Sequence, residues 1–188
     1  MTDFLVRREG TLSVRDHEEI AATLALAFPT YVEGYRGSAS WAGLQPEVRI
    51  TAHDDRGVTA HAGVKRVFVQ IGDGPFAEDQ LVAAVGMVAV RPDLQGSGLG
   101  GRLADAVRGV LGALQVPFGL LETGEDTTGF YVRHGWRALP GAVGTYSDFS
   151  LHGPARVIRQ DHGWHILPVT AEFEDWPDGE IHWNGQMV

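Results

Sequence analysis

The segment 88–101 most restricts what this chain can fold into, because it joins an apolar run to a glycine-rich loop that opens into a helical pattern. Four glycines stand at this junction: Gly96, Gly98, Gly100 and Gly101. Without side chains there, a diphosphate can approach the backbone closely, where N–H groups and the positive end of a helix favour an anion. The alternative is a turn without a ligand, although each glycine inside a helix costs about 1 kcal/mol. The segment therefore predicts a phosphate-binding strand, loop and helix.

Two other phosphate-binding folds fit this segment less well. Gly96, Gly98 and Gly101 satisfy the dinucleotide pattern G-x-G-x-x-G, and Glu122 lies about where the ribose-binding acid belongs. In that fold the glycines follow the strand almost at once, whereas here residues 91–95 intervene. Less than half of the 188-residue chain follows the loop, too little for the rest of such an enzyme. A P-loop is disfavoured because no Gly-Lys-Ser/Thr follows.

The loop resembles the pyrophosphate loop of the GNAT superfamily of acyl-CoA-dependent N-acyltransferases. Its pattern Gln95-x-x-Gly98-x-Gly100 follows a strand that ends in Val90-Arg-Pro-Asp. A second segment, 129–136, resembles the Phe-Tyr-x-x-x-Gly-aromatic sequence that closes the next helix of this superfamily. Together the two motifs predict an α/β GNAT fold, with a central mixed, mostly antiparallel sheet that is splayed at the acyl-CoA site and flanked by helices.

The same resemblance implies acetyl-CoA or another acyl-CoA as the co-substrate, with no metal. The loop would hold the pyrophosphate, while the backbone of the preceding strand would pair with the pantetheine arm and polarise the thioester carbonyl. The residues expected to bind CoA are Met87, Val88, Ala89, Val90, Gln95, Gly96, Ser97, Gly98, Leu99, Gly100 and Gly101.

Attack of an amine on a thioester requires that the amine lose a proton and that the departing thiolate gain one. The resemblance places Tyr131 at the thioester sulfur as the general acid, and a core aromatic role is the alternative. The strand 85–90 carries no acid, whereas many GNAT enzymes place a glutamate there. We therefore take Glu122 as the candidate base, although helix capping or solvation would also explain it. Glu33 and Glu180 stay open as further candidates.

Several other segments resemble the nodulation N-acyltransferase NodA. These segments are 40–49, 55–63, 90–96, 116–119 and 176–179. This resemblance implies transfer of a fatty acyl group from acyl carrier protein to the free amine of a glucosamine oligosaccharide. The chain departs from that family in its full Gln-x-x-Gly-x-Gly loop, which suits CoA, and at Ala84, where the family leads us to expect a glutamate.

A third resemblance is to the aminoglycoside 2′-N-acetyltransferases, through 130–131 with 135–136, 166–169 and 175–180. It implies that Glu180 and Trp183 contact the acceptor. With Glu33 and Trp41, they form the predicted substrate site, in which tryptophans stack on a sugar ring and carboxylates hold ammonium groups. Each tryptophan taken alone is more typical of a core position.

Composition limits the other classes of function. A length of 188 residues with 44% hydrophobic content predicts one GNAT-type acyltransferase domain over 1–188. No apolar run approaches a membrane span, and the first residues carry no secretion signal, so we expect a cytoplasmic protein. The chain has no cysteine, which excludes disulfides and a thiol-bound acyl-enzyme. The net charge of −9 disfavours nucleic acid and fits a cationic small molecule, although it also favours solubility. A homodimer is left open.

Hydrophobic periodicity and turn residues predict the order of the elements. Strands are expected at 4–7, 47–53, 58–71, 80–90 and 116–121, helices at 16–28, 99–114 and from about 125, and a hairpin of 155–160 with 164–169.

The resulting hypothesis is direct acyl transfer, most simply acetyl transfer from acetyl-CoA, to a primary amine of an amino sugar or aminoglycoside-like small molecule. NodA-like transfer of a longer acyl chain from acyl carrier protein is one alternative. A catalytically weak, CoA-binding regulatory module is the other.

Overall fold

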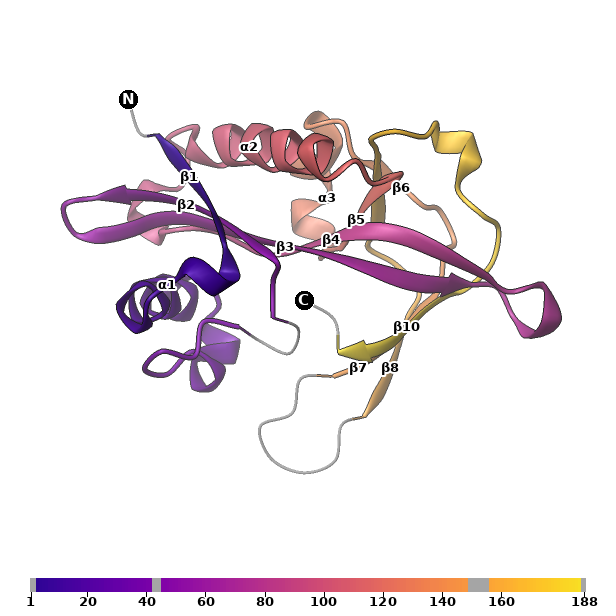
Figure 1. Cartoon of the computed structure of the whole chain (residues 1–188), viewed down its shortest axis with the longest axis horizontal. Helices are drawn as coiled ribbons and strands as arrows, with labels where there is room; N and C mark the ends of the chain where they lie inside the picture. Colours follow the sequence, from indigo (N-terminus) through magenta and orange to yellow (C-terminus); the bar gives the residue numbers. More distant parts are fainter. Residues whose placement is uncertain (1–2, 42–44, 149–155, 187–188) are drawn as a thin grey trace. The chain divides into compact units, whose positions relative to one another are not determined.

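The structure is a computed structural model that describes residues 3–41, 45–148 and 156–186 (Figure 1). Its helices are α1 (Val14–Ala27), α2 (Leu99–Leu114) and α3 (Glu125–Arg133). Its strands are β1 (Phe4–Arg8), β2 (Val48–Asp54), β3 (Gly57–Ile71), β4 (Glu78–Val90), β5 (Phe118–Glu122), β6 (Arg137–Ala138), β7 (Gly144–Ser147), β8 (Val157–Gln160), β9 (Trp164–Pro168) and β10 (Ile181–Gln186). Short 3-10 helices are η1 (Glu9–Thr11), η2 (Pro29–Gly34), η3 (Gly74–Phe76), η4 (Pro92–Leu94) and η5 (Phe173–Asp175).

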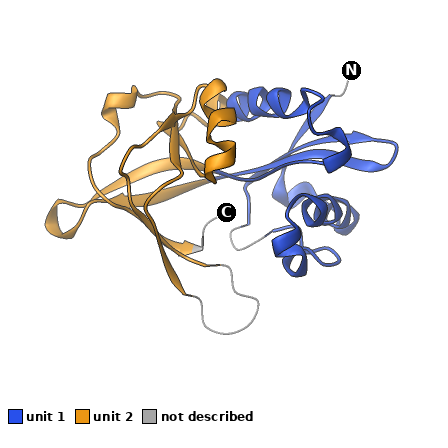
Figure 2. Cartoon of the chain, turned by 180° about the vertical axis from the view of Figure 1, so that it is seen from behind, with its two compact units in different colours: residues 1–65, 85–110, 188 blue, residues 66–84, 111–187 orange. Residues whose placement is uncertain are grey.

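The chain forms two compact units, coloured separately in Figure 2. Unit 1 comprises residues 1–65 and 85–110 with residue 188, and unit 2 comprises residues 66–84 and 111–187. The elements β3, β4 and α2 each run through both units.

In unit 1, β2 pairs antiparallel with both β1 and β3, and Figure 1 shows α1 and α2 on opposite sides of these strands. The helix α1 begins two residues earlier than periodicity predicts, because Ser13 caps it and forms a capping box with Asp16. Pro29 follows its end, as expected. The buried face of α1 contributes Ile20 and Leu24 to a core cluster that also contains Met87 of β4.

In unit 2, the strand order is β6-β9-β5-β4-β3-β10-β7-β8. β10 runs parallel to β7, and β5 runs parallel to β4, while β5–β9, β6–β9, β7–β8 and β3–β10 are antiparallel. Gly119 in β5 allows close packing, since a Cβ there would lie 2.8 Å from Leu111 of α2 and 3.0 Å from Trp136. A side chain at this position would require the Leu111 and Trp136 side chains to move.

The parallel pairing of β4 with β5 is short. It joins Val82–Ala84 to Phe118–Leu120, and in the described part of the chain no pairing between these strands continues beyond it, although β4 extends to Val90. The result is the mixed, mostly antiparallel sheet with flanking helices that the sequence predicts.

The predicted hairpin of 155–160 with 164–169 is wrong. Both segments contain strands, but β8 pairs with β7, whereas β9 pairs with β5 and β6. Burial explains the difference, because Trp164–Leu167 are buried and need neighbours on both sides, while β8 alternates in exposure and lies at the edge of the sheet. The first residue of the predicted hairpin lies outside the described residues.

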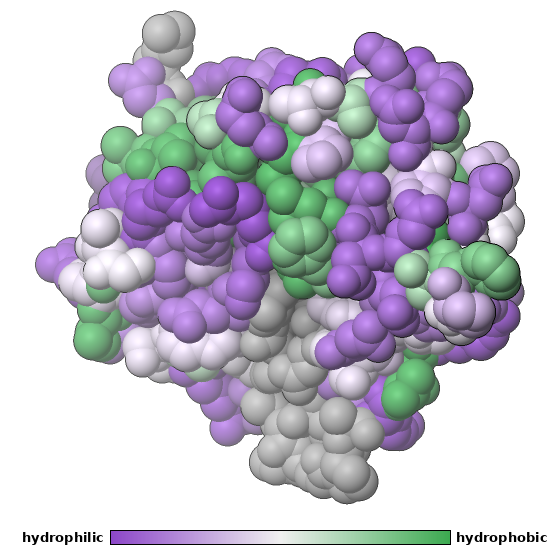
Figure 3. All heavy atoms as spheres, turned by 45° about the vertical axis from the view of Figure 1, so that its right-hand side comes forward, coloured by the Kyte–Doolittle hydropathy of each residue, from purple (hydrophilic) through white to green (hydrophobic). Residues whose placement is uncertain are grey.

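The described surface is mixed in character. Hydrophilic side chains cover much of the face shown in Figure 3, and hydrophobic side chains gather in smaller groups between them. Among the described residues, the helices are too short or too polar to cross a bilayer.

Candidate functional site

The glycine-rich loop lies in unit 1, between η4 and α2. Gly96 and Gly98 have φ angles of 77° and 84°, a left-handed conformation that favours glycine. A Cβ at either position would meet nothing within 4 Å, so the chain itself leaves this side of the loop open. The hydroxyl of Ser97 donates to the Leu94 carbonyl at 2.6 Å and steadies the turn. Because α2 begins at Leu99, its first N–H groups have no acceptor within the helix and face outward along its axis.

The strand that leads into the loop ends in a cluster of ions. Arg91 donates from Nε to Asp93 at 2.7 Å and from Nη2 to Asp54 at 2.5 Å, and Arg56 also pairs with Asp93. Hydrogen bonding to Arg91 lowers the pKa of Asp54 to about 2 and also lowers the pKa of Asp93. The Arg91 N–H donates to the Thr59 carbonyl at 2.9 Å. The cluster thereby ties the start of the loop to the β2–β3 turn.

Met87 departs from the regular strand conformation. Its φ is +52°, although it stands inside β4 and is not glycine. Such a conformation costs about 1–3 kcal/mol, and persists where the surroundings hold it in place. The Met87 carbonyl accepts a hydrogen bond from Nδ1 of His61 at 2.8 Å. The irregular backbone conformation at Met87 therefore lies in the part of β4 that is predicted to polarise the thioester carbonyl.

A buried polar network supports His61. The Arg49 guanidinium is fully buried and donates to Glu9 at 2.7 and 3.1 Å, to the Ser40 carbonyl and hydroxyl at 2.8 and 3.2 Å, and to Nε2 of His61 at 3.1 Å. These five acceptors match its five N–H donors. Burial, and secondarily the Arg49 charge, lowers the pKa of His61 to about 3. The network holds a neutral imidazole at neutral pH.

The sequence-based interpretation missed this network. Arg49 and His61 stand within two of the NodA-like segments, yet neither was proposed as functional. The available signal was their position, because Arg49 stands between Val48 and Ile50, and His61 stands between Ala60 and Ala62. Polar groups in such places are retained only with partners.

Tyr131, the predicted acid, lies on α3 in unit 2. Its ring centroid is 6.5 Å from that of His165 and 6.0 Å from that of Trp136. Burial raises the pKa of Tyr131 to about 12, so the phenol is protonated at neutral pH. His165 contacts the Gly163 carbonyl through Nδ1 at 2.8 Å, while its buried Nε2 has no hydrogen-bond partner among the described residues.

Glu122, the predicted base, lies at the end of β5, also in unit 2. Burial raises the pKa of this carboxyl, and the Gln160 amide donates to it at 3.4 Å. Glu122 is in register with Trp164, whereas its neighbour Leu121 is in register with His165. Adjacent residues of a strand project to opposite faces. Glu122 and His165 therefore project to opposite faces of the β5–β9 pair, and His165 lies on the face that carries the ring contact with Tyr131.

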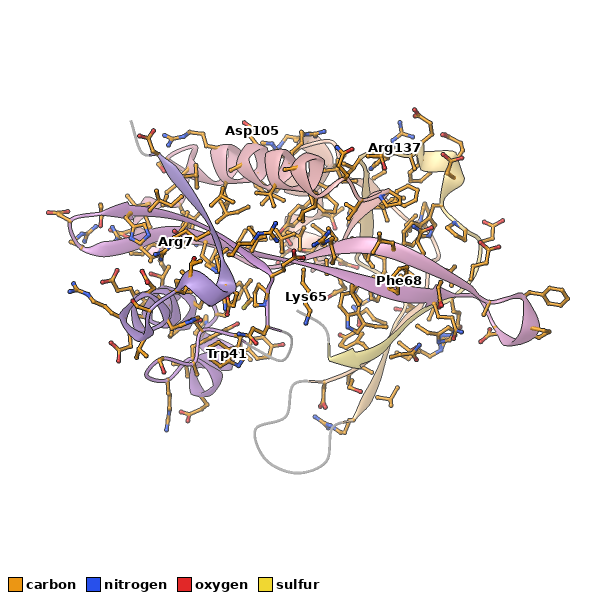
Figure 4. All side chains as sticks on the ribbon, in the orientation of Figure 1. Arg7, Trp41, Lys65, Phe68, Asp105 and Arg137 are labelled. Carbon is orange, nitrogen blue, oxygen red and sulfur yellow. The ribbon has the colours of Figure 1, made fainter. Side chains whose placement is uncertain are left out.

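The four residues predicted to bind the acceptor lie in different surroundings. In unit 1, Glu33 is exposed and pairs with Arg36, while the half-buried Trp41, labelled in Figure 4, meets the ring of His17 edge to face at 5.4 Å.

In unit 2, Glu180 pairs with Arg159, and Trp183 is a buried residue of β10. Their roles toward an acceptor stay predictions. Within the described residues, no group of three or more histidine, aspartate or glutamate side chains is arranged to hold a metal ion.

Solved structures share this fold. A GNAT family acetyltransferase from Brucella melitensis in complex with acetyl-CoA has a TM-score of 0.57 and 20% identity, covering 95% of this chain and 94% of that one. YhbS from Escherichia coli, a GNAT family N-acetyltransferase in complex with CoA, has a TM-score of 0.63 and 17% identity, covering 97% and 91%. These likenesses show that the chain has the GNAT fold.

Within this class, the chain belongs to the Nodulation protein A (NodA) family, whose sequence model matches residues 3–188. It is 36% identical over 184 residues to Nodulation protein A of Mesorhizobium plurifarium and 35% identical over 183 residues to that of Sinorhizobium terangae. Each alignment covers 92% of this chain and 90% of the relative. The NodA resemblance is thus confirmed, and these relatives favour the NodA-like alternative over an aminoglycoside-like acceptor.

Proposed function

We propose that the protein transfers an acyl group from a phosphopantetheine thioester to the free amine of a glucosamine-type sugar. Membership of the NodA family supports the acceptor, since the family resemblance implies an amine of a glucosamine oligosaccharide. The loop from Gln95 to Gly101 supports the donor half of this proposal. Two of its glycines are left-handed, and they leave space beside the loop at the start of α2. Backbone N–H groups at such a helix start favour a phosphate.

The proposed reaction forms a C–N bond and breaks a C–S bond. The neutral amine attacks the thioester carbonyl, and the Val88 N–H stabilises the negative charge that develops on its oxygen. Collapse of this intermediate expels the thiolate, which takes a proton from Tyr131. The proton lost by the amine passes to Glu122 through water, because this carboxyl projects to the face of the β5–β9 pair opposite the ring contact of Tyr131. Its raised pKa makes it a better base than an exposed carboxylate.

CoA and acyl carrier protein present the same phosphopantetheine arm, but they differ in what lies beyond it. CoA carries a diphosphate, for which the complete Gln-x-x-Gly-x-Gly loop has room. The solved structures from Brucella melitensis and Escherichia coli are described with acetyl-CoA and CoA. The NodA resemblance, by contrast, implies a carrier protein. We therefore propose that this chain accepts acyl-CoA. A direct comparison of donors tests which acyl length it prefers and whether it also accepts acyl carrier protein.

The test supplies acetyl-CoA, long-chain acyl-CoA and acyl carrier protein thioesters to the purified protein. Acceptors are a glucosamine oligomer with one free amine, the fully N-acetylated oligomer and an aminoglycoside. We expect thiol release and a product mass increase with the free-amine oligomer only. Transfer to the aminoglycoside alone would overturn the proposed acceptor, and CoA binding without transfer to any acceptor would favour a regulatory module.

Two glycine variants test the loop itself. Gly98→Ala places a Cβ on the open side of the loop at a φ of 84°, whereas Gly109→Ala makes the same change within α2, also with nothing within 4 Å. We expect Gly98→Ala to weaken CoA binding at least ten-fold and Gly109→Ala to leave it unchanged. Equal affinity in the two variants would refute the loop assignment.

A further inference from the structure

We infer that His61 is a positioning residue that fixes the direction of the Met87–Val88 peptide, so that the Val88 N–H faces the thioester carbonyl. This inference rests on the proposed acyl transfer and adds a residue outside the loop and outside the predicted acid and base. All the groups involved lie in unit 1. His61 is completely buried and acts through the backbone of β4.

The hydrogen bonds of His61 determine its tautomer. Arg49 can only donate, and its Nη1 lies 3.1 Å from Nε2 of His61, so Nε2 must be the acceptor. The Met87 carbonyl can only accept and lies 2.8 Å from Nδ1, so Nδ1 must carry the proton. Each nitrogen has one partner of the complementary kind. The imidazole is therefore neutral, with its single proton directed at Met87.

This hydrogen bond sets the direction of the next amide. The carbonyl of Met87 and the N–H of Val88 belong to one trans peptide and point in opposite directions. With the carbonyl held toward His61, the Val88 N–H points away from the network. Met87 reaches this arrangement only with a φ of +52°, which a regular strand does not adopt. The bond from His61 therefore holds a peptide that would otherwise relax.

The rest of the network keeps His61 from turning. Glu9 and Ser40 occupy the other four N–H groups of Arg49, so its fifth remains directed at Nε2. A rotated imidazole would leave a buried donor facing Arg49 and a buried carbonyl unpaired. Both changes are unfavourable in a completely buried site.

Two substitutions separate the effect of the hydrogen bond to Met87 from the effect of side-chain size at position 61. In His61→Asn, the side-chain amide lies where Nδ1 stood and can still donate to Met87. In His61→Gln, the amide lies where Nε2 stood, so the Met87 bond is lost while contact with Arg49 is kept. Asparagine is shorter than glutamine by one methylene, so His61→Asn leaves the larger gap, and a pure packing effect would harm His61→Asn more than His61→Gln. We expect kcat within about five-fold of the native value for His61→Asn and about 100-fold lower for His61→Gln, a loss comparable to removal of one oxyanion donor.

The KM for acyl-CoA should stay unchanged in both variants, because the loop is untouched. Equal kcat values in His61→Asn and His61→Gln would overturn the inference, whether both are normal or both are low. The same holds if His61→Gln raises KM and leaves kcat intact, since that pattern indicates a binding defect.

A second measurement needs neither variants nor turnover. Nitrogen NMR of the native protein, labelled at histidine and valine, should show His61 with the proton on Nδ1 and a bare Nε2, from pH 7 down to pH 5. Addition of acyl-CoA should shift the Val88 amide resonance. A proton on Nε2, or an unmoved Val88 amide in protein saturated with acyl-CoA, would contradict the inference. Absence of transfer alone would count against the proposed function and leave the tautomer test standing.

Discussion

Replacement of Glu9 by glutamine tests how strongly the buried ion pair holds unit 1. The guanidinium of Arg49 is completely buried, and the side chain of Glu9 is 9% exposed. Two hydrogen bonds, of 2.7 and 3.1 Å, join them. Glu9→Gln keeps the volume and one acceptor oxygen, but it removes the negative charge and turns an amide donor toward Arg49. The variant therefore leaves a cation buried without its counterion.

Breaking a buried ion pair by removing one partner costs about 3–5 kcal/mol. We expect the lower end, about 3 kcal/mol, because Arg49 keeps its bonds to Ser40 and His61. With a urea dependence of about 2 kcal/mol/M, the unfolding midpoint should fall by about 1.5 M. An exposed ion pair serves as the comparison. Arg15 and Glu19 of α1 are 85% and 33% exposed, and such a pair contributes about 0.5 kcal/mol at most.

The assay is urea unfolding of the native protein, Glu9→Gln and the control variant Arg15→Gln at pH 7, followed by fluorescence and circular dichroism. The control should shift the midpoint by about 0.2 M. A loss below about 1 kcal/mol in Glu9→Gln would refute the reasoning, because the pair would then contribute no more than an exposed one. A changed dependence of the unfolding free energy on urea would show that the variant and the native protein do not unfold between the same states, so their midpoints could not be compared.

Three further predictions concern catalysis, pH and packing. Tyr131→Phe should lower kcat about 100-fold without changing CoA affinity, and an unchanged kcat in steady-state assays would remove Tyr131 as the acid. Because the pKa of His61 falls from 6.5 to about 3 on folding, only the unfolded chain binds this proton between those values. The free energy of unfolding should then decrease below pH 6.5, by up to about 1.4 kcal/mol per pH unit, and urea titrations of His61→Asn at pH 7, 6 and 5 should lack this component. Gly63→Ala should destabilise the protein by about 1–3 kcal/mol in thermal unfolding, because its Cβ would lie 2.8 Å from Pro46 and 2.9 Å from Met87; native stability would show that both neighbours move aside.

Local signals predicted the elements that carry the glycine-rich loop. The apolar run before it forms β4, and the leucine and valine stripe after it forms α2 with the predicted bounds Leu99–Leu114. Gly96 and Gly98 adopt the left-handed conformation that made them informative. These features depend on neighbours in sequence, so spacing was enough to find them.

Contacts between distant segments could not be read in this way. Arg49 and Glu9 are forty positions apart, and His61 and Met87 are twenty-six apart. A local sequence pattern therefore cannot predict their hydrogen bonds. The partners of β9 likewise depend on which strands have free edges once the sheet forms. Glu122 was chosen for its place at a strand end, but its face follows from pairing with Trp164, which the sequence alone did not define.

Each compact unit is assembled from separate stretches of the chain, and this arrangement has a consequence during synthesis. Residues 1–65 belong to the same unit as 85–110, so the first third of the chain is synthesised before the rest of its unit. At about 5–20 residues per second, translation from residue 65 to residue 110 takes roughly 2–9 s. Met87 is added 26 residues after His61, which takes roughly 1–5 s at that rate, so His61 is made before its partner exists. The charged core of unit 1 can therefore close only after translation has passed the middle of the chain.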